Sequence, residues 1–177
     1  MALERSIVSA ALEYAANGWP VFPCDPETKR PCTKHGFKSA TVDPQIIKAW
    51  WGGPWSKKMI GVPTGKVIGA FVLDINPPAG RDLSWCIREL ELAIGTVPRG
   101  MQTITPNGAH LWFRVPDTVE IRNRGPLLGG AIDCIRGEGG YVIVPPSVKH
   151  DGKQYSWLGF DFLAEPPAKL IELVRPQ

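Results

Sequence analysis

This sequence of 177 residues has only four cysteines and lacks the closely spaced pairs typical of disulfide-rich and zinc-binding proteins. The four cysteines stand at positions 24, 32, 86 and 134, and no two of them form a C-x-x-C pair. Cys24, Cys32 and His35 could supply three zinc ligands, but their spacing matches no familiar zinc knuckle and a fourth ligand is not evident. We therefore expect unpaired thiols rather than a disulfide framework or a structural zinc module.

Long apolar runs and an excess of one charge are also missing. No apolar run approaches the roughly 18–20 residues that a helix needs to cross a bilayer. The N-terminus carries Glu4 and Arg5 and has the pattern of an amphipathic helix, not of a signal peptide. We therefore expect no membrane partner and a location in the cytoplasm. The formal net charge of +3 permits a nucleic-acid partner without indicating one.

The segment GVPTGK, residues 61–66, lacks the spacing of a phosphate-binding loop. A Walker A loop has four residues between its glycines and a Ser or Thr after its Lys. This segment has three residues between its glycines, and Val67 follows its Lys. We interpret it as a tight glycine turn between two strands.

Helix signals dominate the first part of the chain, and strand signals dominate the rest. Asp43 followed by Pro44 is typical of a helix start. Residues 67–75 form a nearly continuous apolar run, as expected of a strand that is buried on both faces. Further strands are predicted at 101–105 and 110–115 around a Pro-Asn-Gly hairpin turn, at 131–136 and 141–144 as a second pair, and at 154–157 as an edge strand.

This order of elements indicates the fold class. A helix-rich start and a strand-rich remainder favour α+β, or α/β with mixed sheets, over an alternating parallel fold. The length suits one domain. We expect a single domain over residues 1–177, with lobes at 1–58 and 59–165 and a C-terminal helix at 167–174.

The stretch FVLDIN, residues 71–76, ends an apolar strand with Asp74 and Asn76. Because side chains alternate along a strand, the two point to the same face, about 6.5–7 Å apart. Oxygen ligands at this spacing can hold a magnesium or manganese ion. The alternative is an ordinary strand end, at which an acid forms a turn, and this stretch alone does not separate the two.

His110 and Asp133 add to the case for a site. His110 opens a strand just after a glycine-bearing turn, and Asp133 stands in an apolar strand. Both could share one cleft with Asp74. The alternative for His110 is a hydrogen-bonded core histidine, and the alternative for Asp133 is a carboxylate paired with Arg136.

Several segments together resemble a known family: GVPTGK, FVLDIN, TPNGAHLWFR, AIDCIRGEGGYVIVPPS, and the Gly, Tyr and Trp of DGKQYSW. In order and spacing they are similar to the bifunctional primase/polymerase N-terminal (prim-pol) domain of the archaeo-eukaryotic primase superfamily. Such domains are typical of phage, plasmid and mobile-element replication proteins. The resemblance covers nearly the whole chain. It implies an archaeo-eukaryotic primase-like fold, with an α/β lobe and a lobe similar to the RNA-recognition fold with a mixed or antiparallel sheet.

The resemblance also implies the site residues. The family has three signature elements, matched here by Asp74-Ile75-Asn76 (acid-x-acid), Gly108-Ala109-His110 (small-x-His) and Ile132-Asp133 (apolar-Asp). In the family the three acids hold two Mg²⁺ or Mn²⁺ ions for nucleotidyl transfer, and the histidine contacts the triphosphate. The matching implies Asp74, Asn76 and Asp133 as metal ligands and His110 as a catalytic residue at the triphosphate.

Neighbouring polar residues extend the predicted nucleotide site. Thr105 and Asn107 could donate hydrogen bonds to the triphosphate, and Gly108 would let backbone approach it closely. Arg136 could pair with a phosphate or with Asp133.

Asn76 departs from the family pattern, which has Asp or Glu at this position. Asn supplies one neutral carbonyl oxygen and no charge, so a second metal should be held poorly. Three explanations are open: an engineered substitution, a natural variant of low activity, or a degenerate copy that only binds. The fold should tolerate Asn, because removing one carboxylate relieves repulsion between like charges.

The resemblance predicts a DNA-dependent primase/polymerase that binds a single-stranded DNA template and nucleoside triphosphates. Family members often continue into a helicase, so we expect a helicase domain in the full-length protein. Two alternatives use the same residues: a catalytically silent module that binds single-stranded nucleic acid, and a metal-dependent nuclease.

Overall fold

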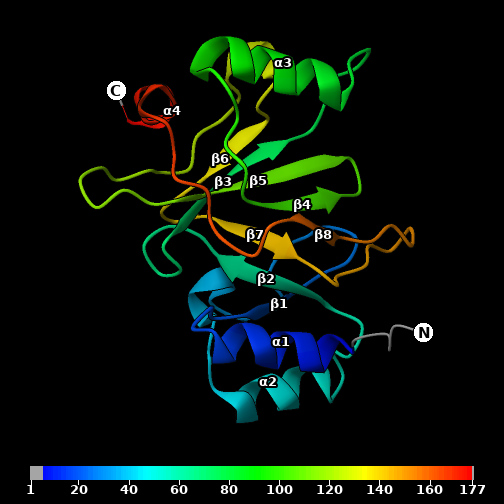
Figure 1. The fold of residues 1–177 in the computed structure, drawn as a ribbon. Helices are drawn as coiled ribbons and strands as arrows, with labels where there is room; N and C mark the ends of the chain where they lie inside the picture. Colours follow the sequence, from blue (N-terminus) through cyan, green and yellow to red (C-terminus); the bar gives the residue numbers. More distant parts are fainter. Residues whose placement is uncertain (1–5, 177) are drawn as a thin grey trace. The chain divides into compact units, whose positions relative to one another are not determined.

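The computed structural model describes residues 6–176, which contain four α-helices and two antiparallel sheets (Figure 1). The predicted α+β class is confirmed. The chain divides into two compact units. The first unit holds the described residues up to Pro63 together with Tyr141–Ser156, and the second holds Thr64–Gly140 and the described residues from Trp157 onward.

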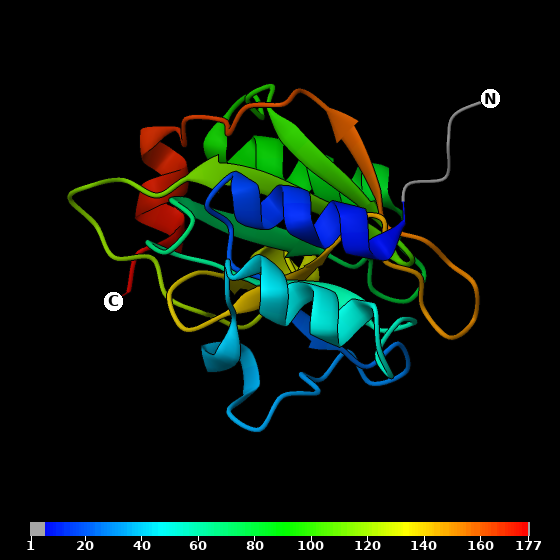
Figure 2. The ribbon, with the colours of Figure 1, turned by 90° about the horizontal axis from the view of Figure 1, so that it is seen from below.

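In the first unit two helices lie side by side (Figures 1 and 2). Asp43 caps the second of them by accepting the N–H groups of Gln45 and Ile46, as its sequence signal predicts. The first unit also contains a three-stranded sheet with the strand order β1-β2-β7. The elements are α1 (Ile7–Ala16), α2 (Pro44–Trp51), β1 (Phe22–Cys24), β2 (Met59–Pro63) and β7 (Tyr141–Val144), with a short 3₁₀ turn at Gly36–Ser39.

The second unit is built on a five-stranded sheet in the order β6-β3-β5-β4-β8. Two helices, α3 and α4, lie on one side of this sheet in Figure 1. The strands are β3 (Ala70–Ile75), β4 (Met101–Thr105), β5 (Gly108–Arg114), β6 (Cys134–Arg136) and β8 (Ser156–Gly159), and the helices are α3 (Leu83–Ile94) and α4 (Ala168–Val174).

The strand order of the second unit is that of an RNA-recognition-like sheet. β5 runs antiparallel to both β3 and β4 and lies between them. β3 and β4 are therefore parallel to each other and are joined by α3, which is the split β-α-β arrangement. β6 adds antiparallel on the outer side of β3. The predicted RNA-recognition-like lobe is confirmed by this topology.

The two faces of the five-stranded sheet differ in chemistry. One face carries Phe71, Leu73 and Ile75 of β3, which pack with α3 and α4 in the core of this unit. Because side chains alternate along a strand, the other face carries Val72 and Asp74 and, in the register with β5, the opposed His110. The position of the acid one residue before the end of β3 therefore decides the face on which it lies.

Two strand predictions need correction. The predicted pair of strands at 131–136 and 141–144 is wrong: β6 pairs with β3 in the second unit, whereas β7 pairs with β2 in the first. The Gly-Glu-Gly-Gly segment between them carries the chain from one sheet to the other instead of closing a hairpin. The strand predicted at 67–75 begins only at Ala70, because Gly69 has a φ of +66° and ends a turn that leaves Val67 half exposed.

Gly108 is required by backbone packing at the start of β5. A Cβ at this position would overlap the carbonyl oxygen of Ile75 on the neighbouring β3. We therefore expect Gly108→Ala to lower the free energy of unfolding by about 1–3 kcal/mol, the usual cost of overpacking. The measurement is urea denaturation, with Gly125→Ala as control, because a Cβ at Gly125 meets nothing within 4 Å. Equal stability of the two variants would contradict this role.

Candidate metal and nucleotide site on the five-stranded sheet

Asp74 is the centre of a cluster of polar side chains on the sheet face opposite α3 and α4. It is only 9% exposed. Its neighbours across the sheet are His110 on β5 and Cys134 on β6, which stand directly opposite it in the two strand registers. β3, which lies between β6 and β5, thus presents one carboxylate to a group on each side.

Each carboxylate oxygen of Asp74 faces a different partner. Oδ1 lies 3.6 Å from Nε2 of His110, whose side chain is 6% exposed. Oδ2 lies 3.4 Å from an Nη of Arg136, and it accepts a hydrogen bond from the thiol of Cys134 at 3.5 Å. Arg136 comes from the same face of β6, two residues after Cys134. The alternative that pairs Arg136 with Asp133 is not what forms, because the ion pair of Arg136 in the described chain is with Asp74.

These neighbours set the ionisation of the cluster. Burial acts to raise the pKa of Asp74, but the His110 imidazole and the Arg136 guanidinium beside it outweigh burial and hold this pKa at about 2. Burial, reinforced by the negative charge of Asp74, raises the pKa of the Cys134 thiol to about 12. Asp74 is therefore a carboxylate at neutral pH, and Cys134 is a neutral thiol in the absence of a metal ion.

Asp133 reaches the cluster from the residue before β6. Its backbone N–H donates to the carbonyl oxygen of Asp74 at 2.9 Å, which fixes it beside the end of β3. Its Oδ2 accepts a hydrogen bond from the side-chain nitrogen of Asn76 at 3.3 Å. Because an ionised carboxylate only accepts hydrogen bonds, the amide of Asn76 presents its donor to Asp133 in this arrangement and turns its oxygen elsewhere.

The β4–β5 hairpin ends beside the same end of β3. Thr105 Oγ1 accepts the N–H of Gly108 at 3.0 Å and so closes the turn. Gly108 in turn lies against Ile75 and Pro77. Asn107 is exposed at the tip of the turn. The hairpin residues predicted from the sequence therefore flank the cluster, whereas Asp74, Asn76, His110, Asp133 and Arg136 are linked by direct contacts.

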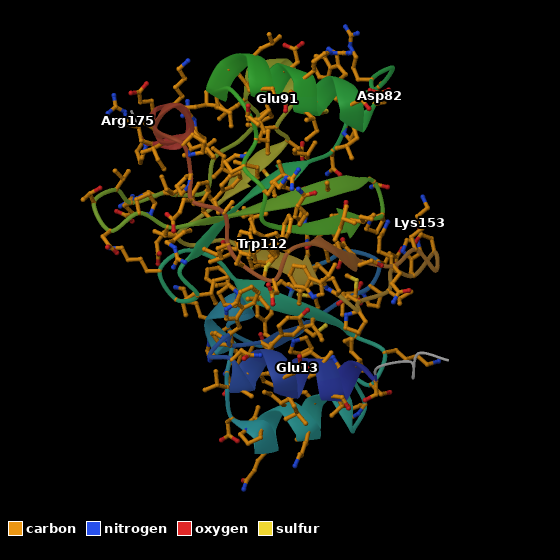
Figure 3. The ribbon with its side chains drawn as sticks, viewed as in Figure 1. Glu13, Asp82, Glu91, Trp112, Lys153 and Arg175 are labelled. Atoms are coloured by element: carbon orange, nitrogen blue, oxygen red, sulfur yellow. The ribbon has the colours of Figure 1, made fainter. Side chains whose placement is uncertain are left out.

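A second row of contacts supports His110 within the sheet. Trp112, two residues further along β5, is 1% exposed and donates from Nε1 to the Thr103 hydroxyl at 3.0 Å. Thr103 is the partner of His110 in the β4–β5 register. The ring centroids of His110 and Trp112 are 6.5 Å apart. Figure 3 labels Trp112 among the side chains drawn on the ribbon. This buried row limits the movement of the imidazole.

The residues of the cluster fit a divalent cation. Asp74, Asp133 and Cys134 each offer one ligand atom, and these three atoms all lie within 4.8 Å of one another. The two carboxylates are ligands that magnesium and manganese accept. Cys24, Cys32 and His35 form no such group within residues 6–176, and the four cysteines are free thiols in the structure.

Cys134 is the member of the cluster that the sequence analysis missed. Neighbouring residues on a strand face opposite sides, so a strand at 131–136 would separate Cys134 from Asp133. In the structure β6 begins only at Cys134. Asp133 lies outside the regular alternation, and both side chains reach Asp74. Only the register between β3 and β6 shows that Cys134 stands opposite Asp74, and the sequence alone does not give this register.

An RNA-recognition-like sheet that gathers two carboxylates, an imidazole and a guanidinium on one face defines a class of α+β protein suited to divalent cations and phosphates. The sequence profile of the family described as "Bifunctional DNA primase/polymerase, N-terminal" matches residues 11–170. The chain therefore belongs to this primase/polymerase family, as the resemblance implied. A comparison with curated proteins finds no match. In the described part of the chain, no helix has the length and hydrophobicity needed to cross a membrane.

Proposed function

We propose that residues 1–177 form the catalytic domain of a DNA-dependent primase/polymerase that adds nucleotides on a single-stranded DNA template. Membership of the family indicates, in general terms, a primase/polymerase activity and nucleotidyl transfer. The observation that supports the specific proposal is the contact of Asp74 with His110 and Arg136 on one sheet face, with Asp133 fixed beside it. We place the protein in the cytoplasm of a host cell, as part of a phage, plasmid or mobile-element replication protein.

Asp74 and Asp133 are the proposed anchors of the metal ions. When bound, two divalent ions would activate the attacking 3′-hydroxyl and neutralise charge on the triphosphate. The chain itself keeps Asp74 ionised through His110 and Arg136, so that no proton has to leave this carboxylate at neutral pH. Arg136 is 36% exposed at its side chain and can pair with a phosphate as well as with Asp74.

The triphosphate is assigned to the side of the cluster formed by β5 and the β4–β5 hairpin. His110 is the proposed phosphate contact, since its Nε2 lies 3.6 Å from Oδ1 of Asp74, a proposed metal ligand. Thr105, Asn107 and Gly108 are proposed to add backbone and side-chain donors from the hairpin end. Pre-positioned donors of this kind stabilise charge that develops in the transition state.

The template strand needs a positively charged surface, because phosphate contacts dominate the affinity for nucleic acid. The first unit offers Arg30, Lys34 and Lys38 as exposed cations near one another in sequence. In the second unit Arg122 is paired with Glu120 at 3.1 Å, so it is less available. We assign template binding to the cluster in the first unit, and we propose that a helicase domain completes the full-length protein.

Asn76 is proposed to weaken catalysis by removing one charged ligand. Its amide donates to Asp133, so it would have to turn over to offer its oxygen to an ion. A hydrogen bond to a charged group contributes about 1.5–3 kcal/mol. Rotation of the Asn76 amide would break this hydrogen bond. The same contact favours one alternative, a silent module that binds single-stranded nucleic acid and has lost its metal ions.

A titration with nucleoside triphosphate separates these functions. The proposed polymerase should bind triphosphate in the presence of manganese and lose this binding when the ion is chelated. It should also bind single-stranded DNA with an affinity that falls as salt rises. DNA binding without any metal-dependent triphosphate binding would support the silent module, and degradation of DNA in the absence of nucleotide would support a nuclease.

A further inference from the structure

The thiol of Cys134 lies close enough to the carboxylates of Asp74 and Asp133 to serve as a third metal ligand. Asn76 turns its nitrogen toward Asp133 at 3.3 Å and therefore contributes a donor there. Cys134 contacts the other carboxylate, with Sγ 3.5 Å from Oδ2 of Asp74. One ligand atom from each of the two carboxylates and from the thiol lie within 4.8 Å of one another, so these three groups can hold one ion.

The separation between Cys134 and Asp74 suits a shared metal ion. Sulfur and oxygen ligands bind zinc at about 2.3 Å and 2.0–2.2 Å, so on a tetrahedral ion they lie roughly 3.5 Å apart. The present distance between Sγ and Oδ2 is 3.5 Å. Coordination of an ion would replace the hydrogen bond between thiol and carboxylate, and the thiol proton would be released to solvent.

The mixture of ligands points to a particular class of cation. Magnesium takes oxygen ligands and does not favour sulfur, whereas zinc and cobalt accept carboxylate oxygen and thiolate together. Three protein ligands leave a fourth position open on a tetrahedral ion. Arg136, which also contacts Oδ2 of Asp74, has a side chain that is 36% exposed and can leave this oxygen to the ion.

We propose that Asp74, Asp133 and Cys134 form a binding site for a thiophilic divalent cation of the zinc and cobalt class. This ion competes with magnesium for the two carboxylates. The inference rests on the proposed function in that Asp74 and Asp133 are assumed to face a divalent ion, but it requires neither DNA nor nucleotide. Cys134 therefore decides which metal ions the site prefers, and zinc should displace magnesium from it.

The test is a titration of the whole chain with Co²⁺, without DNA or nucleotide, under reducing conditions. We expect an absorption band from thiolate-to-cobalt charge transfer. Cys134→Ser should abolish the band and weaken zinc binding at least about tenfold, since even the outer partners of metal ligands contribute about 10–100-fold to affinity. Cys134→Val, which also removes the thiol, should behave in the same way.

Cys32→Ser is the matched control, because Cys32 is the other partly exposed thiol of the described chain. The control should keep the cobalt band. Alkylation of the unmodified chain gives a second measurement that needs no variant: cobalt should protect Cys134, and not Cys32, from iodoacetamide in a peptide map.

Absence of the thiolate band, its loss in Cys32→Ser, or alkylation of Cys134 at the same rate with and without cobalt would overturn the proposal. Its failure can be told apart from failure of the proposed function. Binding of magnesium or manganese with triphosphate but no thiolate band would remove this inference alone. A cobalt site at Cys134 in a chain that never incorporates nucleotide would remove the polymerase assignment alone.

Discussion

Replacing Asn76 with aspartate should raise nucleotide incorporation on a single-stranded template at least about tenfold, which corresponds to about 1.4 kcal/mol on the barrier. Asn76 lies 3.3 Å from Asp133, and Asp133 is fixed to the backbone of Asp74. A carboxylate at position 76 would therefore add a charged oxygen beside both acids. It would complete the acid-x-acid element with little change of shape.

The same substitution should carry a cost when no metal ion is bound. Asn76→Asp replaces a donor with an acceptor that faces the carboxylate of Asp133, so a hydrogen bond becomes a repulsion between like charges. We expect the free energy of unfolding of the metal-free protein to fall by about 1–3 kcal/mol. Saturating manganese should restore it, because an ion that binds only the folded state stabilises by about 2.7 kcal/mol at 100 times its dissociation constant.

Thermal unfolding with and without manganese measures this coupling. Asn76→Ala is the matched control, since it removes the amide without adding a charge. Manganese should stabilise this variant no more than it stabilises the unmodified chain. If manganese stabilises Asn76→Asp no more than Asn76→Ala, position 76 does not face the ion.

His110→Ala should weaken the binding of triphosphate about tenfold to a hundredfold, because contacts of phosphates with polar or charged donors contribute about 1.5–3 kcal/mol. Binding of single-stranded DNA should persist. His110 stands across the sheet from Asp74, with Nε2 3.6 Å from Oδ1. A ligand phosphate next to a metal ion on Asp74 would therefore lie within reach of the imidazole after a small shift.

The alternative role of His110 is structural, since the residue is 5% exposed and packs beside Trp112. Thr103→Val provides the control for this role. It removes the acceptor of the Trp112 hydrogen bond in the same buried row and should lower stability without changing triphosphate affinity. A His110→Ala protein that is destabilised but binds triphosphate as the unmodified chain does would identify a core histidine.

The sequence allowed the prediction of the fold class from local patterns, whereas the members of the cluster were implied by the resemblance to the family. The apolar run before Asp74 indicates a buried strand, and period-two alternation places Asn76 on the same side as Asp74. His110 and Asp133 could be named from their motifs. That they meet Asp74 depends on strand pairing between residues far apart in sequence, which local patterns do not specify.

The errors have the same physical origin. Strands that are neighbours in sequence pair or lie adjacent roughly two-thirds of the time, so the Gly-rich segment after Arg136 suggested a hairpin. Instead β6 and β7 pair with strands of different sheets. The role of Cys134 was hidden for a related reason, since only the β3–β6 register shows that it stands opposite Asp74. The partner of Arg136 is likewise fixed by this register.

The most direct test is incorporation of nucleotides on a single-stranded template by three folded proteins, with magnesium or manganese and nucleotide at saturation. The proteins are the unmodified chain, Asn76→Asp, and the double variant Asn76→Asp/Asp74→Asn. We predict incorporation by Asn76→Asp at least about tenfold above the unmodified chain, and a return to background in the double variant. Incorporation by Asn76→Asp that stays at background, or that survives the loss of the Asp74 carboxylate, would contradict the assignment of this cluster as a polymerase site.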